Sequence, residues 1–191
     1  MKQVKKTTIG ECAKIIHGVL PHGKSNQTAR YSYVAVQPGQ LTVDGLTGDF
    51  GTVTRDLPCA EEQFLQSGDI LIKRLNPDCA VEFHGHREPV VAAANVFVLR
   101  AGRDLEPVFL AFLLEGSSLM QRIVQRSGIG STVSAVTVQQ IASCEIPLPP
   151  LHLQRKLGEL WKLGKKEEKL LRGMLAENAR RLRAVCGALS L

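Results

Sequence analysis

The 191-residue sequence contains no apolar run of the roughly 18 residues that a helix needs to cross a bilayer. Its N-terminus, Met1 to Lys6, is basic but is not followed by the apolar core of a signal peptide. A hydrophobic content of 44% is typical of a folded domain and does not suggest disorder. We therefore expect a cytoplasmic protein with room for one ordinary domain and an appendage.

Cysteine is present, but not in a pattern that builds a disulfide framework or a metal site. The five cysteines are odd in number and widely spaced, and no two of them form a CxxC pair. We interpret the following residues as buried free thiols: Cys12, Cys59, Cys79, Cys144 and Cys186.

The motifs of the common enzyme classes are also missing. There is no GxxxxGK[ST] phosphate loop, no GxGxxG that opens a helix and no GxSxG nucleophile elbow. His84 and His86 could bind a metal with Glu82 or Glu88, but two histidines without a third ligand cluster are a weak signal, and a surface loop is the simpler interpretation. The sequence therefore gives no positive case for an enzyme, and we expect the chain to hold neither a metal nor a cofactor.

The excess of positive charge is confined to the C-terminal end. Residues 151–191 contain ten Lys and Arg against four Asp and Glu, which equals the net charge of +6 of the whole chain. The other 150 residues are neutral overall, although residues 1–30 contain six basic side chains against Glu11 alone. A basic surface indicates an anionic partner such as nucleic acid, so this interpretation applies to the two ends of the chain and not to the middle.

Turn signals divide residues 31–100 into short strands. Strands are expected at residues 31–36, 70–73, 80–83 and 90–100, where β-branched and apolar residues lie between Gly, Pro, Asn and Asp. Residues 41–56 also favour short strands, whereas residues 4–20 fit either a short helix or strands. This pattern predicts a β-rich body that is sandwich- or barrel-like.

Helices are expected after the strands. Pro107 opens an apolar helix over residues 107–114, and a second helical segment follows at 119–124. Three prolines, Pro147, Pro149 and Pro150, then hold the chain extended and end at a long run of good helix formers. The run predicts one helix from Leu151 to about Leu189, which would be roughly 58 Å long.

This last helix has a heptad pattern, which indicates packing along another helix. Gly164 and Glu168 weaken the middle of the pattern, and the polar Asn178 lies on it, where it could fix the register. Two readings are open: the helix pairs with a partner, or it folds back onto its own domain. The residues expected at the dimerisation seam are Leu157, Trp161, Leu171, Leu175, Asn178, Leu182, Val185 and Leu189.

Five segments follow one another in an order that is known from one protein family. They are the Gly-Asp strand Ser67–Ile72, the small-residue strand Ala93–Leu99, the helix Pro107–Leu114, the loop Gly130–Val133 and the proline hinge Ile146–Arg155, which contains Gln154. Together they resemble the specificity (S) subunits of type I restriction–modification systems. One position departs from the pattern, because Leu153 stands where the family usually has Glu.

The resemblance implies an α+β fold: a β-rich DNA target recognition domain (1–148) with a few helices, followed by a hinge and one long coiled-coil spacer helix (149–191). The usual subunit of the family has two such domains and two antiparallel helices, so this chain resembles a half-subunit that forms a homodimer. Implied partners are double-stranded DNA with a bipartite target, a modification methyltransferase and a restriction subunit. Those subunits would supply the S-adenosylmethionine, Mg²⁺ and ATP chemistry.

Sequence is read by side chains at base edges, while phosphate contacts set the register. The resemblance assigns no base contact, so polar and basic loop residues are chosen by residue type. The candidates are Lys24, Ser25, Asn26, Gln27, Arg30 and Tyr31; Thr52, Thr54 and Arg55; Lys73 and Arg74; and His84, His86 and Arg87, with Ser131 and Thr132 as further phosphate contacts. The basic face of the helix is either solvated or contacts phosphates or an acidic partner.

Two alternatives belong to other classes. The chain could be a stand-alone DNA-binding regulator or an inhibitor of a restriction system. It could also be a nuclease that binds a metal through Asp44, Asp49 or Asp56. The spacing of these aspartates matches no nuclease motif, and Asp in a Gly/Thr-rich stretch more often forms turns.

Overall fold

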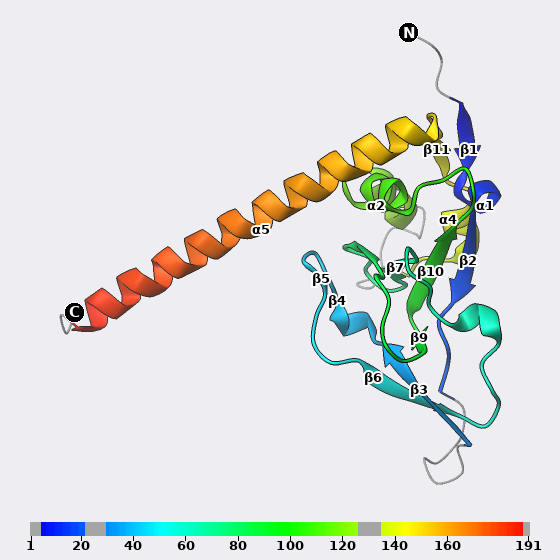
Figure 1. Cartoon of the computed structure of the whole chain (residues 1–191), viewed down its shortest axis with the longest axis horizontal. Coiled ribbons are helices and arrows are strands. Elements are labelled where there is room, and N and C mark those ends of the chain that lie inside the picture. Colours follow the sequence, from blue (N-terminus) through cyan, green and yellow to red (C-terminus); the bar gives the residue numbers. More distant parts are fainter. Residues whose placement is uncertain (1–4, 22–29, 126–134, 189–191) are drawn as a thin grey trace.

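A computed structural model describes residues 5–21, 30–125 and 135–188 of the chain. A mixed α/β body is followed by one long helix, α5 (Leu151–Ala188), which leaves the body at an angle (Figure 1). The helix begins beside β1 and β11 at one end of the body, and β3 and β6 lie at the other end. The expected α+β class, with a β-rich domain and a long C-terminal helix, is therefore confirmed.

The central sheet has the strand order β2-β10-β7-β8, built from β2 (Ala13–His17), β10 (Val96–Ala101), β7 (Ile70–Lys73) and β8 (Ala80–Glu82). All neighbours are antiparallel, and Val98 lies between Ile16 and Leu71. Both faces of the sheet are buried. Val98 and its partners face one core cluster, whereas Phe97 and Leu99 face another, which explains why β7 and β10 are nearly continuous apolar runs.

A second sheet, β6-β3-β9, contains β6 (Gly51–Arg55), β3 (Tyr31–Val36) and β9 (Val90–Ala92). Its end is joined to the central sheet, because Val19 N donates to Ala92 O at 2.7 Å and Gly18 N donates to Val96 O at 2.9 Å. Only glycine fits at this junction, since a Cβ on residue 18 would lie 2.0 Å from Ala93 O. The β-rich body predicted from the sequence thus contains two separate sheets that backbone hydrogen bonds join at this junction.

Residues 90–100 do not form the single strand that the sequence predicts. The chain turns between β9 and β10, and Asn95 adopts a left-handed conformation with φ of 65°. Asparagine tolerates this conformation better than most residues do. The turn lets β9 join the second sheet while β10 joins the first.

Residues 5–20, the described part of the segment that fitted either a helix or strands, contain both. β1 (Lys6–Thr8) is followed by the one-turn helix α1 (Ile9–Cys12) and then by β2. β1 pairs with β11 (Glu145–Pro147), so that the N-terminal segment lies against the proline hinge. The short helix α4 (Val138–Ala142), which begins at the cap residue Thr137, leads into β11.

The helices α2 (Pro107–Glu115) and α3 (Leu119–Gln125) cover one face of the central sheet and confirm the two helices predicted there. Phe109, Leu110 and Leu114 are fully buried in this layer. Within the described residues, no single helix is long and apolar enough to span a membrane. The bent pair of α2 and α3, which meet at 61°, passes such a test together by length and composition alone.

The Gly-Asp turn before β7 is fixed by a buried ion pair. Gly68 has a φ of 91°, which favours glycine, and the side chain of Asp69 is 1% exposed. Arg100 donates to both carboxylate oxygens of Asp69, at 2.8 and 2.7 Å, and to Phe64 O at 2.8 Å. The pair therefore ties the short 3-10 turn η2 (Glu61–Gln63) and the segment after it to the sheet, and it raises the pKa of Arg100.

A small hairpin lies on the other face of the central sheet. After the 3-10 turn η1 (Pro38–Gln40), β4 (Leu41–Thr42) pairs with β5 (Gly45–Leu46). Leu41 is fully buried in the cluster that also contains Leu71 and Val81, so the hairpin is anchored on β7 and β8.

The cysteine prediction is correct in part. All five thiols are free, and Cys79 and Cys144 are buried. Cys12 and Cys59 are half-buried, and Cys186 is exposed near the end of α5, which contradicts the prediction for that residue. Burial raises the pKa of Cys79 to about 12.

Candidate functional site

The first candidates lie at the end of the body that is remote from the start of α5 (Figure 1). In the β3–β6 pair, Tyr31 lies opposite Arg55, and Thr52 and Thr54 lie opposite Val34 and Ser32. Tyr31 is exposed and stacks on Tyr33, with ring centroids 6.4 Å apart. The pairing thus brings Arg55, the last residue of the second predicted group, opposite Tyr31, the last residue of the first.

The other members of these two groups differ in how exposed their side chains are. Arg55 is half-buried, and its Nη1 donates to Cys59 Sγ at 3.5 Å, so its guanidinium is partly engaged within the body. Arg30 and Thr52 are exposed. The following candidates lie outside the described residues: Lys24, Ser25, Asn26, Gln27, Ser131 and Thr132.

Lys73 and Arg74 form a separate group at the end of β7. Lys73 is mostly buried and makes an ion pair with Asp78 at 2.9 Å, whereas the Arg74 side chain is exposed. The backbone of Arg74 is held on both sides, because its N–H donates to Asn95 O at 2.7 Å and its carbonyl accepts from Val136 N at 2.9 Å. Arg74 is therefore an exposed cation on a fixed backbone.

The loop between β8 and β9 carries the third group, His84, His86 and Arg87, all exposed. His86 Nδ1 accepts a hydrogen bond from Glu88 N at 3.2 Å, and its ring lies 5.2 Å from that of Phe50. Among the described residues, no three His, Cys, Asp or Glu side chains are placed to hold a metal ion together. The described candidates therefore lie on three structural elements: the β3–β6 pair, the end of β7 and the β8–β9 loop.

The three aspartates of the nuclease alternative do not come together. Asp44 lies in the turn of the β4–β5 hairpin, where its Oδ1 contacts Arg172 of α5 at 2.8 Å. Asp49 and Asp56 lie at the two ends of β6. The geometry therefore does not support a metal-dependent nuclease at these residues.

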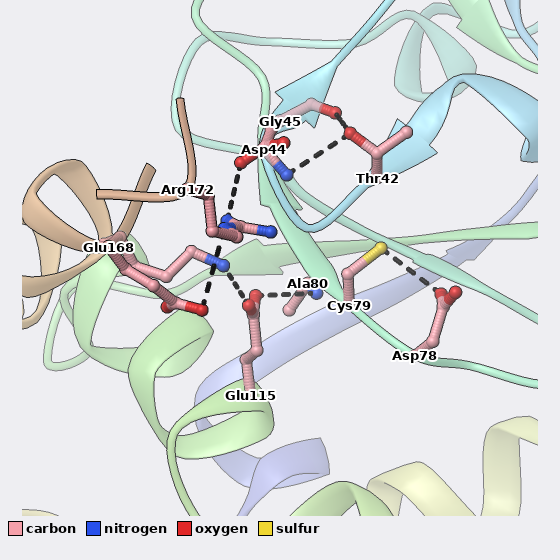
Figure 2. A network of polar contacts seen from close by, with 10 residues as sticks. Thr42, Asp44, Gly45, Asp78, Cys79, Ala80, Glu115, Glu168 and Arg172 are labelled. Atoms are coloured by element: carbon pink, nitrogen blue, oxygen red, sulfur yellow. Dashed lines mark hydrogen bonds and ion pairs between the residues drawn. The ribbon is translucent and has the colours of Figure 1, made fainter. Parts of the chain in front are cut away.

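The basic face of α5 is partly explained by ion pairs with residues that are distant in the sequence. Four of its cations contact acidic groups of the body: Arg155 with Glu106, Lys162 with Glu82, Lys165 with Glu115 and Arg172 with Asp44. Arg180 and Arg181 pair with Glu177 of the same helix. Figure 2 shows the part of this network that joins α5, α2 and the hairpin.

The start of α5 is fixed to the body by two residues whose role the heptad pattern does not reveal. Gln154 is 1% exposed; its Oε1 accepts from Glu106 N at 2.9 Å, and its Nε2 donates to Asp104 O at 2.9 Å and to Pro149 O at 2.8 Å. Gly158 allows α2 and α5 to approach closely, because a Cβ there would lie 3.1 Å from Val108. The hinge motif, which contains Gln154, was the signal for the first of these residues.

The predicted dimerisation seam divides into two parts. Leu157 and Trp161 pack against the core of their own body. For this first part of the helix, the structure therefore agrees with the alternative that α5 folds back onto its own domain. Leu171, Leu175, Leu182 and Val185 are 54% to 69% exposed, and Asn178 is exposed. Leu189 lies outside the described residues.

The exposed apolar face of α5 is wider than the seam. Five further large side chains are exposed: Leu153, Leu160, Leu163, Leu170 and Met174. At 3.6 residues per turn they lie on the same side of the helix as Leu171 and Leu182. These five residues are spaced seven, three, seven and four residues apart in the sequence. This spacing indicates a second apolar row on the helix, which the predicted seam does not include. An exposed apolar surface of this extent is typical of an interaction site.

A protein-family model matches most of the chain. Residues 1–162 match the sequence model of a family described as the type I restriction modification DNA specificity domain. No curated protein matches the chain in sequence.

Three solved structures have a similar fold. A protein from a study of complex assembly and conformational transition of the type I R-M system has a TM-score of 0.69 and 18% identity, covering 95% of this chain and 43% of that chain. The HsdS subunit from Thermoanaerobacter tengcongensis has a TM-score of 0.65 and 18% identity, with 89% and 39% covered. The type I restriction-modification S subunit from M. genitalium has a TM-score of 0.54 and 11% identity, with 94% and 44% covered. The chain thus spans less than half of each of these structures.

Proposed function

Because the chain belongs to the type I restriction–modification DNA specificity domain family, we propose that it is the non-catalytic subunit that recognises DNA for a methyltransferase. The observation that carries the proposal is the family match over residues 1–162, which includes the body and the start of α5. In this proposal residues 1–148 read the DNA, and residues 149–191 connect and space two such readers.

The DNA-reading part would use the exposed polar and basic groups of the body. Tyr31 and Thr52 lie on the β3–β6 pair, which Arg30 precedes, and Arg74, His86 and Arg87 lie on other turns. Arginine can donate two hydrogen bonds to a guanine edge, and the side-chain amides of Asn and Gln can form two hydrogen bonds with adenine. These residues remain predictions, as does the contribution of Lys24, Asn26 and Gln27.

The spacer part would be a homodimer of α5 helices. The support is the exposed apolar face, which includes Leu171, Leu175 and Leu182 and which one copy of the chain leaves uncovered within the described residues. A two-fold pair would bury the same face of both copies. An antiparallel pair would place the two bodies at opposite ends, so that they read two half-sites in inverted orientation, and Asn178 is a candidate for fixing the register.

The chemistry would belong to other subunits. We propose that the dimer binds a modification methyltransferase, and in a restricting complex a restriction subunit as well. S-adenosylmethionine, Mg²⁺ and ATP would be bound by these partners. No residue of this chain is assigned to these ligands.

The experiment that tests this function is sequencing of methylated bases in DNA from cells that express the chain with its methyltransferase. The expected result is a split motif whose two halves are inverted repeats, because both halves are read by identical domains. An unsplit or asymmetric motif would contradict the proposal. Cells that carry the methyltransferase alone provide the control and should lack the motif.

Copurification separates this function from that of a stand-alone regulator or inhibitor. The proposed subunit should retain the methyltransferase during purification at micromolar concentrations. A chain that binds DNA but retains no methyltransferase would favour the regulator.

A further inference from the structure

Three ion pairs join α5 to the body beyond its buried start. Lys162 Nζ lies 2.7 Å from Glu82 Oε2 at the end of β8, Lys165 contacts Glu115 at the end of α2, and Arg172 lies 2.8 Å from Asp44 in the β4–β5 turn. The Lys162 contact is an ion pair without hydrogen-bond geometry, because Glu82 Oε2 has no hydrogen-bond partner among the described residues.

The three cations lie on the side of α5 that faces the body. They are three and seven residues apart, and at about 1.5 Å per residue they span about 15 Å of the helix. Lys165 also lies 5.7 Å from the centroid of the Trp161 ring, and its partner Glu115 accepts a hydrogen bond from Ala80 N at 3.3 Å (Figure 2). This contact therefore connects α5, α2 and β8 at one point.

The outermost contact depends on the hairpin, which holds Asp44 in a defined position. Thr42 Oγ1 donates to Gly45 O at 2.8 Å and accepts from Asp44 N at 3.3 Å (Figure 2). Gly45 has a φ of 108°, which favours glycine. Leu41, next to the turn, is fully buried against the central sheet. The carboxylate that meets Arg172 is thus presented by a turn that is itself anchored in the core.

A groove of about 540 Å³ lies between the hairpin and α5, lined by Val43, Phe50 and Trp161 among others. The helix and hairpin are therefore not packed tightly against each other along this stretch, and ion pairs bridge the groove. Arg172 is the last residue along α5 whose described ion pair reaches the body. The following residues, Gly173 to Ala176, are exposed.

The position of this contact matters because a small change in the angle of a long helix moves its far end by a large distance. A tilt of about 10° about its start would displace the far end of the helix by about 10 Å, which corresponds to about three base pairs of DNA. Single exposed ion pairs contribute little to stability. A tilt away from the body, however, would break all three pairs together, so their combined effect is on the angle of the helix.

We propose that the Asp44–Arg172 contact between the β4–β5 hairpin and α5 sets the angle of the helix against the body and thereby the number of base pairs between the two DNA half-sites. Asp44 and Arg172 are positioning residues in this proposal, since they act through the angle of the helix. The inference rests on the proposed function, because only a paired reader has a half-site separation to set.

The test measures the preferred spacer length. DNA duplexes carry the two half-sites of the wild-type motif with the spacer varied one base pair at a time. Asp44→Ala and Arg172→Ala should each shift the preferred length by at least about one base pair or broaden it, while the half-site bases stay the same. The charge-reversed pair Asp44→Arg with Arg172→Asp should restore the wild-type preference, which a merely destabilising change would not do.

Arg180→Ala is the matched control. Arg180 Nη2 lies 3.0 Å from Glu177 Oε2, an ion pair of the same kind that lies entirely within α5 and away from its exposed apolar face. The control should leave the spacer preference unchanged. If the two single variants also keep the wild-type preference, the inference is overturned although the split motif, and with it the proposed function, stands.

A distance measurement tests the angle without DNA. Spin labels at the exposed Cys186 and at Glu61→Cys on the body, with Cys12 and Cys59 replaced by Ser, report the position of the helix end. Labelled chain is diluted with unlabelled chain so that only distances within one copy count. Asp44→Ala should shift or broaden the distance distribution, and an unchanged distribution contradicts the inference. Wild-type chain that recognises no split motif refutes the proposed function, and the assignment of half-site separation falls with it.

Discussion

The body and the far half of α5 differ in whether their apolar side chains are buried. In the body, both faces of the central sheet are covered, and Val98, Leu99 and Leu110 are buried. In α5, every large apolar side chain from Leu170 to Val185 is exposed, and the helix region 151–191 carries the whole net charge of the chain. The body can thus be stable as a single copy, whereas the helix needs another surface to cover its apolar face.

The same contrast exists within α5 itself. Near its start, Gln154 and Gly158 fit the helix to α2, and Trp161 packs on the core. Past Arg172 the helix leaves the body. A helix that is fixed at one end and exposed at the other can transmit the position of the body to a partner, which is the property that a spacer between two DNA readers requires.

The largest expected effect comes from placing charge on the exposed apolar face. Leu175→Asp with Leu182→Asp would put carboxylates into the proposed helix pair, where an unpaired buried charge costs on the order of 3 kcal/mol or more. The dissociation constant of the dimer should rise at least about 100-fold, measured by analytical ultracentrifugation. Ala176→Asp, on the other side of the helix, is the matched control and should leave it nearly unchanged. Equal effects of both changes would refute the assigned face.

A change inside the body should do the reverse and lower stability without altering the helix pair. Asp69→Ala would leave Arg100 without its carboxylate and Gln66 N without its acceptor. Removing one partner of a buried pair typically costs about 3 kcal/mol or more. We expect a lower free energy of unfolding in urea. Glu88→Ala, an exposed carboxylate, should change it by less than about 0.5 kcal/mol. A similar stability of the Asp69 variant and the wild type would contradict the structural role of the turn.

A larger side chain at Gly158 should weaken the docking of the start of α5 on α2. Gly158→Leu would force α5 away from Val108, and overpacking of this kind costs about 1–3 kcal/mol. Gly173→Leu is the control, because a Cβ there meets nothing within 4 Å and leucine favours helices. Thermal unfolding should show a lower Tm for the first variant and an equal or higher Tm for the second. A lower Tm for both would mean that the docking at Gly158 is not the cause.

The smallest effect concerns the reactivity of the cysteine thiols, which should differ between the body and the far half of α5 and can be measured without a mutation. Because burial raises the pKa of Cys79 to about 12, Cys79 contains almost no thiolate at a pH of about 8.5. The exposed Cys186 should therefore react with iodoacetamide first, and Cys79 only after unfolding, as measured by peptide mass spectrometry. Early labelling of Cys79 in the folded chain would show that the region around β8 opens.

Much of the fold could be predicted because local signals and the final structure agree. Pro107, the Gly68–Asp69 turn and the proline hinge mark elements whose bounds the structure confirms within a few residues. The turn at Asn95 could not be predicted, since its left-handed backbone depends on two sheets that compete for the flanking residues. The split of the seam between Leu157 and Leu171 was equally hidden, because the heptad pattern is the same whether the neighbour is the body or another helix.

The site was less accessible to sequence reasoning than the fold. The Asp44–Arg172 contact joins residues that are 128 positions apart, so no local pattern connects them. The sequence presents Asp44 as a turn residue or a metal ligand, and Arg172 as part of a basic face. Their pairing became visible when the hairpin and the helix were placed in space.

The most direct test of the central claim is the mass of the wild-type chain in solution, measured by light scattering at micromolar concentration. A homodimer formed through α5 predicts twice the monomer mass of 20.8 kDa. The same measurement on the Leu175→Asp, Leu182→Asp variant should give the monomer mass. A wild-type chain that remains at 20.8 kDa under these conditions would contradict the account.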